Sequence, residues 1–225
     1  MIRNIDINEL ENAKFYDAND MARLDAGECN GCHACCCGTG DTLNLDPYDV
    51  YRLESGLSKD FKTLLAEHLE LRVADGIIMP FLKMDKELTL GDVTENDACT
   101  FLNEHGRCSI HAYRPAICRL FPLGRVYEDG RHKYWLMENE CHKENRTKVK
   151  IKKWLDTPDF AKYETYIDDW HAFTNGITKQ VASLPEDQLK ALNMAILQYF
   201  YFLDYDTNKD FYSQFYERLE ALLAN

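Results

Sequence analysis

The sequence feature that most constrains this chain is a dense group of cysteines near its N-terminus. The segment ECNGCHACCCGTG, residues 28–40, carries five of the nine cysteines, and four more follow at positions 99, 108, 118 and 141. Disulfide geometry restricts bonding between adjacent cysteines, and a disulfide framework usually has an even number of them. The pattern therefore favours thiolates that bind metal, with distant segments of the chain meeting around it.

The spacing within this segment is typical of two kinds of metal site. Cys29-x2-Cys32-x2-Cys35 is the spacing that surrounds an iron–sulfur cluster, with a fourth ligand arriving from elsewhere. A CxxC pair also supplies two corners of a tetrahedral zinc site, but zinc modules more often contain a second, separate CxxC pair, which this sequence lacks. We therefore expect an iron–sulfur cluster, with zinc as the alternative.

Composition and charge narrow the function classes. The 225 residues are 45% hydrophobic and 28% charged, as in ordinary globular proteins. The formal net charge of −12 argues against non-specific binding to nucleic acid. The N-terminus lacks the apolar core of a signal peptide, and the longest apolar run, IIMPFL at 77–82, is too short for a membrane span. We therefore expect a cytoplasmic protein whose cysteines stay reduced.

The cysteine motifs, taken in order, carry a family resemblance. They are CNGCHACC, then CTFL at Cys99, CSIHAYRP at Cys108, CRLFPLG at Cys118 and ECHKENR around Cys141. This set resembles the bacterial YkgJ-like family of zinc- or iron-chelating cysteine-cluster proteins, over residues 28–146. Cys37 exceeds the CxxCxxCC pattern of that family. The resemblance implies the following metal ligands: Cys29, Cys32, Cys35, Cys36, Cys99, Cys108, Cys118 and the late Cys141.

Other side chains near the cysteines have candidate roles beside the metal. Several thiolates around a metal leave net negative charge, and its burial requires nearby donors and cations. Arg114 and Arg119 flank Cys118, and we expect them to bind the cofactor by donating to sulfur or by bracing the loop. The alternative is an ordinary pair of surface arginines. The three histidines closest to cysteines, His33, His111 and His142, are expected to be loop residues that face solvent.

Three functions are compatible with a cysteine-bound metal. The first is an iron–sulfur protein with a redox role, or with methyl transfer that uses S-adenosylmethionine, because the family resemblance extends to flagellin lysine methylase. The second is a zinc-stabilised binding module, and the third is a metal-handling protein without catalysis. The sequence leaves open whether the chain is an enzyme, and it identifies no protein or small-molecule partner and no oligomeric state.

The remaining pattern predicts a mainly α fold with little β structure. We divide the chain into an N-terminal extension (1–28), a loop-rich cysteine-cluster metal domain (29–146) and a C-terminal helical region (147–225) that packs on it. Helices are expected from 47 to 56, from 58 to 73 and, with apolar stripes, in three stretches after 157. Short strands are expected within 75–92 and at 133–137.

Overall fold

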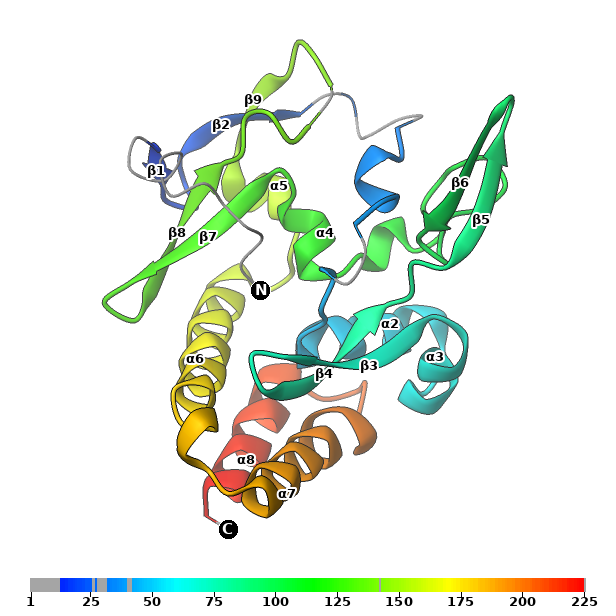
Figure 1. Cartoon of the computed structure of the whole chain (residues 1–225). Helices are drawn as coiled ribbons and strands as arrows, with labels where there is room; N and C mark the ends of the chain where they lie inside the picture. Colours follow the sequence, from blue (N-terminus) through cyan, green and yellow to red (C-terminus); the bar gives the residue numbers. More distant parts are fainter. Residues whose placement is uncertain (1–12, 26, 28–31, 40–41, 142, 225) are drawn as a thin grey trace.

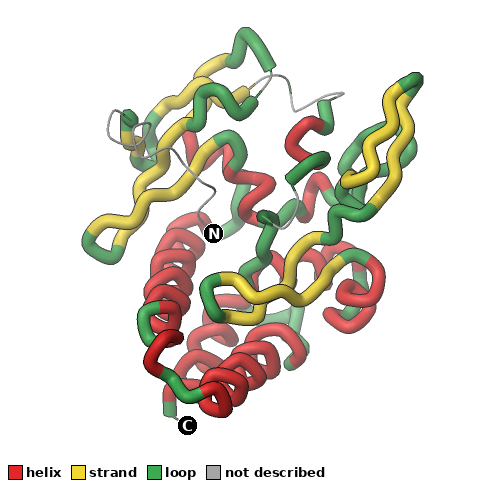
Figure 2. Tube along the Cα trace, in the orientation of Figure 1, coloured by secondary structure: helices red, strands yellow, loops and turns green. Residues whose placement is uncertain are grey.

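The computed structural model describes residues 13–25, 27, 32–39, 42–141 and 143–224. The helices of this part of the chain fall into an early and a late group. The early ones are α2 (Pro47–Leu57), α3 (Phe61–Glu67) and α4 (Ala116–Leu120). The late ones are α5 (Ile151–Leu155), α6 (Phe160–Thr178), α7 (Glu186–Leu197) and α8 (Phe211–Leu223). Helices α6, α7 and α8 gather toward the C-terminal end of the molecule, whereas most strands lie toward the opposite end (Figures 1 and 2).

The strands form several small antiparallel sheets. Strands β1 (Phe15–Tyr16), β8 (Arg131–Leu136) and β7 (Leu123–Glu128) make a three-stranded sheet in that order. Strand β2 (Met21–Asp25) pairs with β9 (Thr147–Lys150), so the N-terminal strands join segments more than 100 residues away. Two separate hairpins are β3 (Leu69–Ala74) with β4 (Ile77–Leu82), and β5 (Lys86–Leu90) with β6 (Val93–Ala98).

The expectation of a mainly α chain with little β structure is wrong. The structure is 42% helical and 25% strand, with four small antiparallel sheets in its described part. Most of the missed structure is in the middle of the chain: residues 69–74, predicted to continue a helix, form β3 and pair with β4. The helix at 47–57, the strands at 77–82 and 131–136 and the three late helices are confirmed.

Aspartate–glycine turns explain two of the missed strands, β3 and β7. Asp75 and Gly76 have φ values of 52° and 84°, and Asp129 and Gly130 have 50° and 77°. Two successive residues with positive φ make the tight turn whose twist matches that of paired strands, and Asp-Gly is a preferred sequence for it. Each pair therefore closes a hairpin, and residues 69–74 gain backbone hydrogen bonds from β4 that outweigh their helical spacing.

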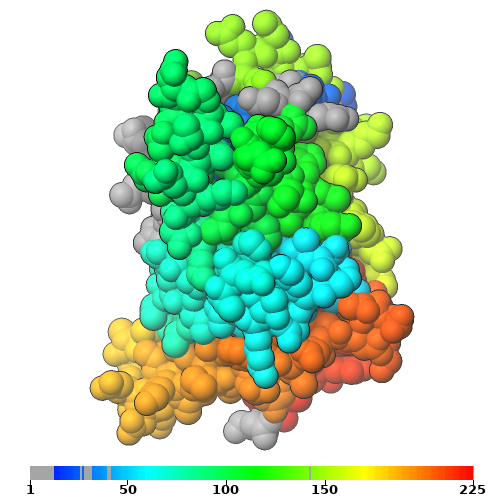
Figure 3. All heavy atoms as spheres, turned by 90° about the vertical axis from the view of Figure 1, so that its right-hand side faces the viewer, coloured from blue at the N-terminus to red at the C-terminus, as the bar shows by residue number. Residues whose placement is uncertain are grey.

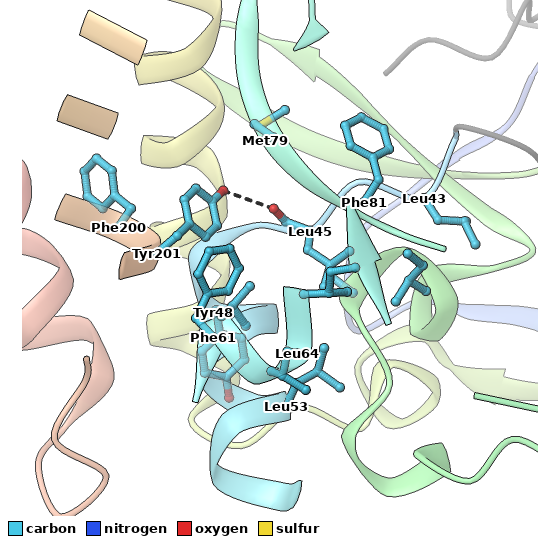
Figure 4. Close-up of a cluster of buried hydrophobic side chains, with 14 of the residues drawn as sticks. Leu43, Leu45, Tyr48, Leu53, Phe61, Leu64, Met79, Phe81, Phe200 and Tyr201 are labelled. Atoms are coloured by element: carbon cyan, nitrogen blue, oxygen red, sulfur yellow. Dashed lines mark hydrogen bonds between the residues drawn. The ribbon is translucent and has the colours of Figure 1, made fainter. Parts of the chain in front are cut away.

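The main hydrophobic core joins the cysteine-bearing half to the C-terminal helices. Tyr201 is 1% exposed, packs against Phe61 with ring centroids 5.7 Å apart, and donates a hydrogen bond of 3.1 Å to the Leu45 carbonyl (Figure 4). Around the first turn of α2, the ring of Tyr48 contacts those of Tyr163 and Phe211. In Figure 3 the α3 region lies directly between the green segment above it and the orange C-terminal helices.

A second, smaller core lies under the strands at the other end. It is formed by Ala22, Leu24, Leu120, Leu123, Tyr134, Ile151 and Leu155. These residues come from β2, α4, β7, β8 and α5, so the helix that carries Cys118 is anchored between the two cores. Within the described residues, no helix is long and apolar enough to cross a membrane.

Candidate metal centre

Backbone hydrogen bonds hold the first two cysteine segments together. Cys35 and Cys36 lie in a single 3-10 turn (Ala34–Cys36), and the amide of Cys99 donates a hydrogen bond of 2.8 Å to the Cys36 carbonyl. Cys37 forms an antiparallel bridge with Ala98, and the amide of Gly38 donates to the carbonyl of Asp97. The cysteine segment at 32–37 is therefore fixed beside the end of β6.

The next two cysteines are placed by a loop and a short helix. Cys108 bridges to Leu102, which follows Cys99 by three residues, so Cys99 and Cys108 flank one tight loop. Cys118 lies in the middle of α4. The first amide of α4, that of Ala116, donates a hydrogen bond of 2.6 Å to a carboxylate oxygen of Asp49, which fixes where this helix begins.

Six cysteines from these segments line one cavity of about 580 Å³, and they are Cys32, Cys35, Cys36, Cys99, Cys108 and Cys118. The sulfur atoms of Cys35 and Cys36 lie 3.9 Å apart. Among the described residues, no group of three or more His, Cys, Asp or Glu side chains has an arrangement that would hold a metal ion as it stands. The structure thus brings the thiols to one cavity without closing them around a common centre.

Several of these thiols have raised pKa values. A hydrogen bond with Cys35 and burial raise the pKa of Cys36 far above its usual range, and burial does the same for Cys118. Burial raises the pKa of Cys99 to about 11. All three thiols are therefore neutral at pH 7 without a metal, and a bound cation would stabilise their thiolates.

The kind of metal that suits this cavity follows from the side chains that could bind it. Six thiols and the buried surroundings suit a thiophilic metal, because soft sulfur ligands select zinc and iron–sulfur clusters over calcium or magnesium. The hydrogen bond with Cys35 and burial for Cys36, and burial for Cys118, are the main causes of the raised pKa values, and the charges of neighbouring cysteines add to both rises. The residues present therefore fit a zinc or iron–sulfur group.

The other predicted ligands lie elsewhere or outside the described residues. Cys29 is outside them. Cys141 does not line the cysteine cavity. Cys37, the cysteine beyond the family pattern, lines a neighbouring depression with His33, Glu95 and Asp97. Burial, followed by those two carboxylates, raises the pKa of Cys37 to about 11.

The two predicted arginines have different surroundings. Arg114 lines the cysteine cavity, and its charge opposes the rise that burial causes in the pKa of Cys108. Arg119 is 3% exposed; it donates to the Thr157 hydroxyl at 2.9 Å and lies 3.7 Å from a carboxylate oxygen of Asp49. Arg119 therefore braces the segments around α4, and none of its contacts in the described part of the chain is to sulfur.

The sequence analysis did not identify Asp46 and Asp49 as residues of the site, although Asp49 positions α4. Asp46 caps α2, and Asp49 closes the reciprocal capping box with it. The same Asp49 also binds the amide of Ala116, and burial raises its pKa above the usual range while the charge of Arg119 opposes the rise. The DPYD sequence shows the cap, but only the fold shows that one member also holds the helix of Cys118.

The cavity extends well beyond the thiols, which the sequence does not indicate. Its far end is lined by residues of β7 and of α6, including Arg125 and His171. His111 lines the cavity near the cysteines, although it is exposed. Because α6 contributes this wall, the C-terminal helices contribute to the space beside the cysteines as well as to the core.

Comparison with known proteins supports metal binding by this chain. No curated protein and no solved structure matches the chain. The model of one family, CxxCxxCC, described as "Putative zinc- or iron-chelating domain", matches residues 28–154, which is more than half of the chain and contains all nine cysteines. The resemblance expected from the cysteine motifs is thereby confirmed. The chain belongs to the CxxCxxCC family of zinc- or iron-chelating domains.

Proposed function

We propose that this protein binds an iron–sulfur cluster in its cysteine cavity and uses it in a redox reaction. The observation that carries the proposal is that six cysteines, drawn from three separate stretches of the chain, line a single cavity. A structural zinc ion and an iron–sulfur cluster each take four protein ligands, so the six thiols suffice for either group. The family membership supports a metal of this class, zinc or iron, and the CxxCxxC spacing favours the cluster.

The residues of the site would perform three tasks. The cavity cysteines, together with the sequence-predicted Cys29, would supply the ligands. Arg114 would offset negative charge beside Cys108, because its own positive charge already lowers the pKa of that thiol. Asp49 and Arg119 would hold α4, and with it Cys118, in position. A bound cluster would supply one-electron transfer.

The test is elemental analysis of protein purified without oxygen. We expect iron and acid-labile sulfide in comparable amounts, and visible absorption that dithionite bleaches. A colourless protein with stoichiometric zinc would contradict the cluster and favour the zinc-stabilised module. Metal that a chelator removes without loss of folded structure would favour the metal-handling protein. A folded, metal-free protein would contradict metal binding altogether.

Adjacent cysteines provide a matched pair of variants. Cys36→Ser removes a thiol that lines the cavity, whereas Cys37→Ser makes the same change one residue later, outside the cavity lining. We expect the first to lose most of its metal and the second to keep it. Equal losses from both variants would contradict the ligand set. A third variant, Cys141→Ser, decides whether this cysteine joins the cavity ligands, as the family resemblance implies.

A further inference from the structure

The far end of the cysteine cavity has the properties of a small-molecule site. The lining continues from the thiols to β7 and α6, which are in contact here through the Tyr127 and His171 rings. Strand β7 contributes Arg125 and Tyr127 to it, and α6 contributes Trp170, His171 and Asn175. The whole cavity, about 580 Å³, is within the range of small-molecule sites. Such sites combine apolar and aromatic walls with a few polar groups that orient the ligand.

The polar group at this end is an incompletely satisfied arginine. Nη2 of Arg125 donates a hydrogen bond of 2.8 Å to the Tyr163 hydroxyl. Its Nε atom is buried and has no hydrogen-bond partner, and no carboxylate of the described residues lies within ion-pair distance of its guanidinium. A buried cationic donor in this state is costly, because it has given up water without gaining an anion.

One carboxylate that interacts electrostatically with Arg125, that of Asp46, is already hydrogen-bonded within the chain. Burial raises the pKa of Asp46, and the charge of Arg125 opposes that rise, so the two groups sense each other electrostatically. However, Oδ1 of Asp46 accepts the amide hydrogen of Asp49 at 2.9 Å and the Tyr166 hydroxyl at 3.1 Å. Asp46 thus serves α2 and α6, and Arg125 keeps the capacity to bind an anion from outside the chain.

The walls next to Arg125 are flat and aromatic. The rings of Tyr127 and His171 are stacked, with their centroids 3.4 Å apart and an angle of 8° between their planes. Trp170, which is 6% exposed, lines the same part of the cavity. A planar ligand body would pack against such rings, and its acidic group would then meet the guanidinium.

We propose that this end of the cavity binds a small planar carboxylate, with Arg125 as the residue that binds its acidic group. The site goes beyond the proposed redox function, because it depends on no particular metal. Its position in the same cavity as the cysteines would place a bound molecule beside the metal centre.

The first test uses the wild-type, metal-loaded chain and two probes of nearly equal shape. Benzoate carries the carboxylate and benzamide is its neutral counterpart. Binding is followed by tryptophan fluorescence, since Trp135 and Trp170 both line the cavity, and by the shift in the thermal unfolding midpoint. We expect benzoate to bind at least about tenfold more tightly than benzamide, because a charged hydrogen bond is stronger than a neutral one.

A matched arginine on the same hairpin provides the control variant. Arg125→Met removes the proposed anion-binding group, whereas Arg131→Met removes an exposed arginine at the start of β8. We expect the first to weaken benzoate binding at least about tenfold and the second to leave it unchanged. Both variants should keep the metal content of the wild type. Arg125→Lys keeps the charge without the planar fork and should bind with intermediate affinity.

Three results would overturn the proposal. One is equal affinity of the wild type for benzoate and benzamide, which needs no variant to fold. Another is unchanged benzoate binding by Arg125→Met. The last is the absence of any fluorescence or thermal response up to about 10 mM benzoate, which is weaker than the affinity expected of a built site. Each of these can occur with normal metal content, so they are distinct from a failure of the metal-binding function.

Discussion

The hydroxyl of Tyr166, in the middle of α6, donates a hydrogen bond of 3.1 Å to Asp46, the residue that caps α2. The same oxygen accepts the amide hydrogen of Tyr48 at 3.2 Å. One phenol therefore links the C-terminal helices to the helix that follows the first cysteine segment, across a sequence separation of 120 residues. Both residues are buried, so neither hydrogen bond can be replaced by water.

Replacement of Tyr166 with Phe should lower the free energy of unfolding by about 1–3 kcal/mol, because the buried amide of Tyr48 loses its acceptor and the Asp46 carboxylate loses one of its two donors. Urea unfolding measures the change. Tyr216→Phe is the matched control: its hydroxyl donates to Asp169 at 2.7 Å, but both residues are only partly buried. We expect the control to cost less than half as much, and equal costs would contradict the role assigned to the buried link.

Two helical glycines should respond to alanine in opposite directions. In α6, a Cβ on Gly176 would meet no atom within 4 Å, so Gly176→Ala should raise the stability by about 0.5–1 kcal/mol. In α2, a Cβ on Gly56 would lie 2.3 Å from the Cγ of Tyr113. Gly56→Ala should therefore lower the stability by about 1–3 kcal/mol despite the better helix propensity.

Thermal or urea unfolding of both variants checks the signs. Tyr113 lies in a short 3-10 turn between Cys108 and Cys118, so its displacement should also reduce the metal content of Gly56→Ala. Gly176→Ala should keep the wild-type content. Stabilisation by Gly56→Ala would show that this turn moves without cost.

The carboxyl group of Glu54 should make stability depend on pH. Burial, and then the charge of Asp204, raise its pKa from 4.5 to about 7. Between these values the folded state binds more protons than the unfolded state, so stability should fall as the pH rises through this window. The full effect is up to about 3 kcal/mol.

Glu54→Gln isolates this group from the others that titrate in the same range. Urea unfolding at about pH 5 and about pH 8 should show a smaller loss of stability for the variant than for the wild type. Parallel pH profiles of the two proteins would contradict the raised pKa of Glu54.

The side chain of Asn193 should be one of the more sensitive polar positions. It is 6% exposed, accepts the amide hydrogen of Ile78 at 2.7 Å and donates to the carbonyls of Gly76 and Leu189, each at 3.1 Å. It therefore joins α7 to the turn between β3 and β4. Asn193→Ala should cost about 2 kcal/mol in urea unfolding, because buried backbone groups lose their partner.

An exposed asparagine provides the comparison. Asn208 is exposed before α8 and its side chain donates a hydrogen bond to Asp206, which is also exposed, so Asn208→Ala should change the stability by less than about 0.5 kcal/mol. A similarly small change at both positions would contradict the role assigned to the buried hydrogen bonds of Asn193.

The predictability of the fold differed between kinds of signal. The cap at Asp46 and the apolar stripes after residue 157 are local patterns, and they predicted helices that the structure contains. Residues 69–74 have helical spacing, but the Asp75–Gly76 turn brings β4 beside them as a partner strand. The spacing of apolar residues within 69–74 contains no information about that partner. The Asp-Gly pairs were the available signal for the missed hairpins.

The candidate site likewise has features that local sequence patterns predicted and features that only long-range contacts create. Cysteine spacing predicted that distant thiols share a location, and the family model agrees with the metal class. The dual role of Asp49 and the wall contributed by α6 arise from contacts between segments that are far apart in sequence. No pattern within either segment records such a contact, so only the fold could reveal Arg125 as a neighbour of the cysteine cavity.

The hydrogen bond between the Cys99 amide and the Cys36 carbonyl has a consequence for the order of assembly. Because the main chain already restricts the separation of these two thiols, an arriving ion would meet two cysteines that are already close together in the folded chain. Occupation would then act mainly on side-chain rotation and on proton release, and the rate of loading would track thiol ionisation more than chain diffusion.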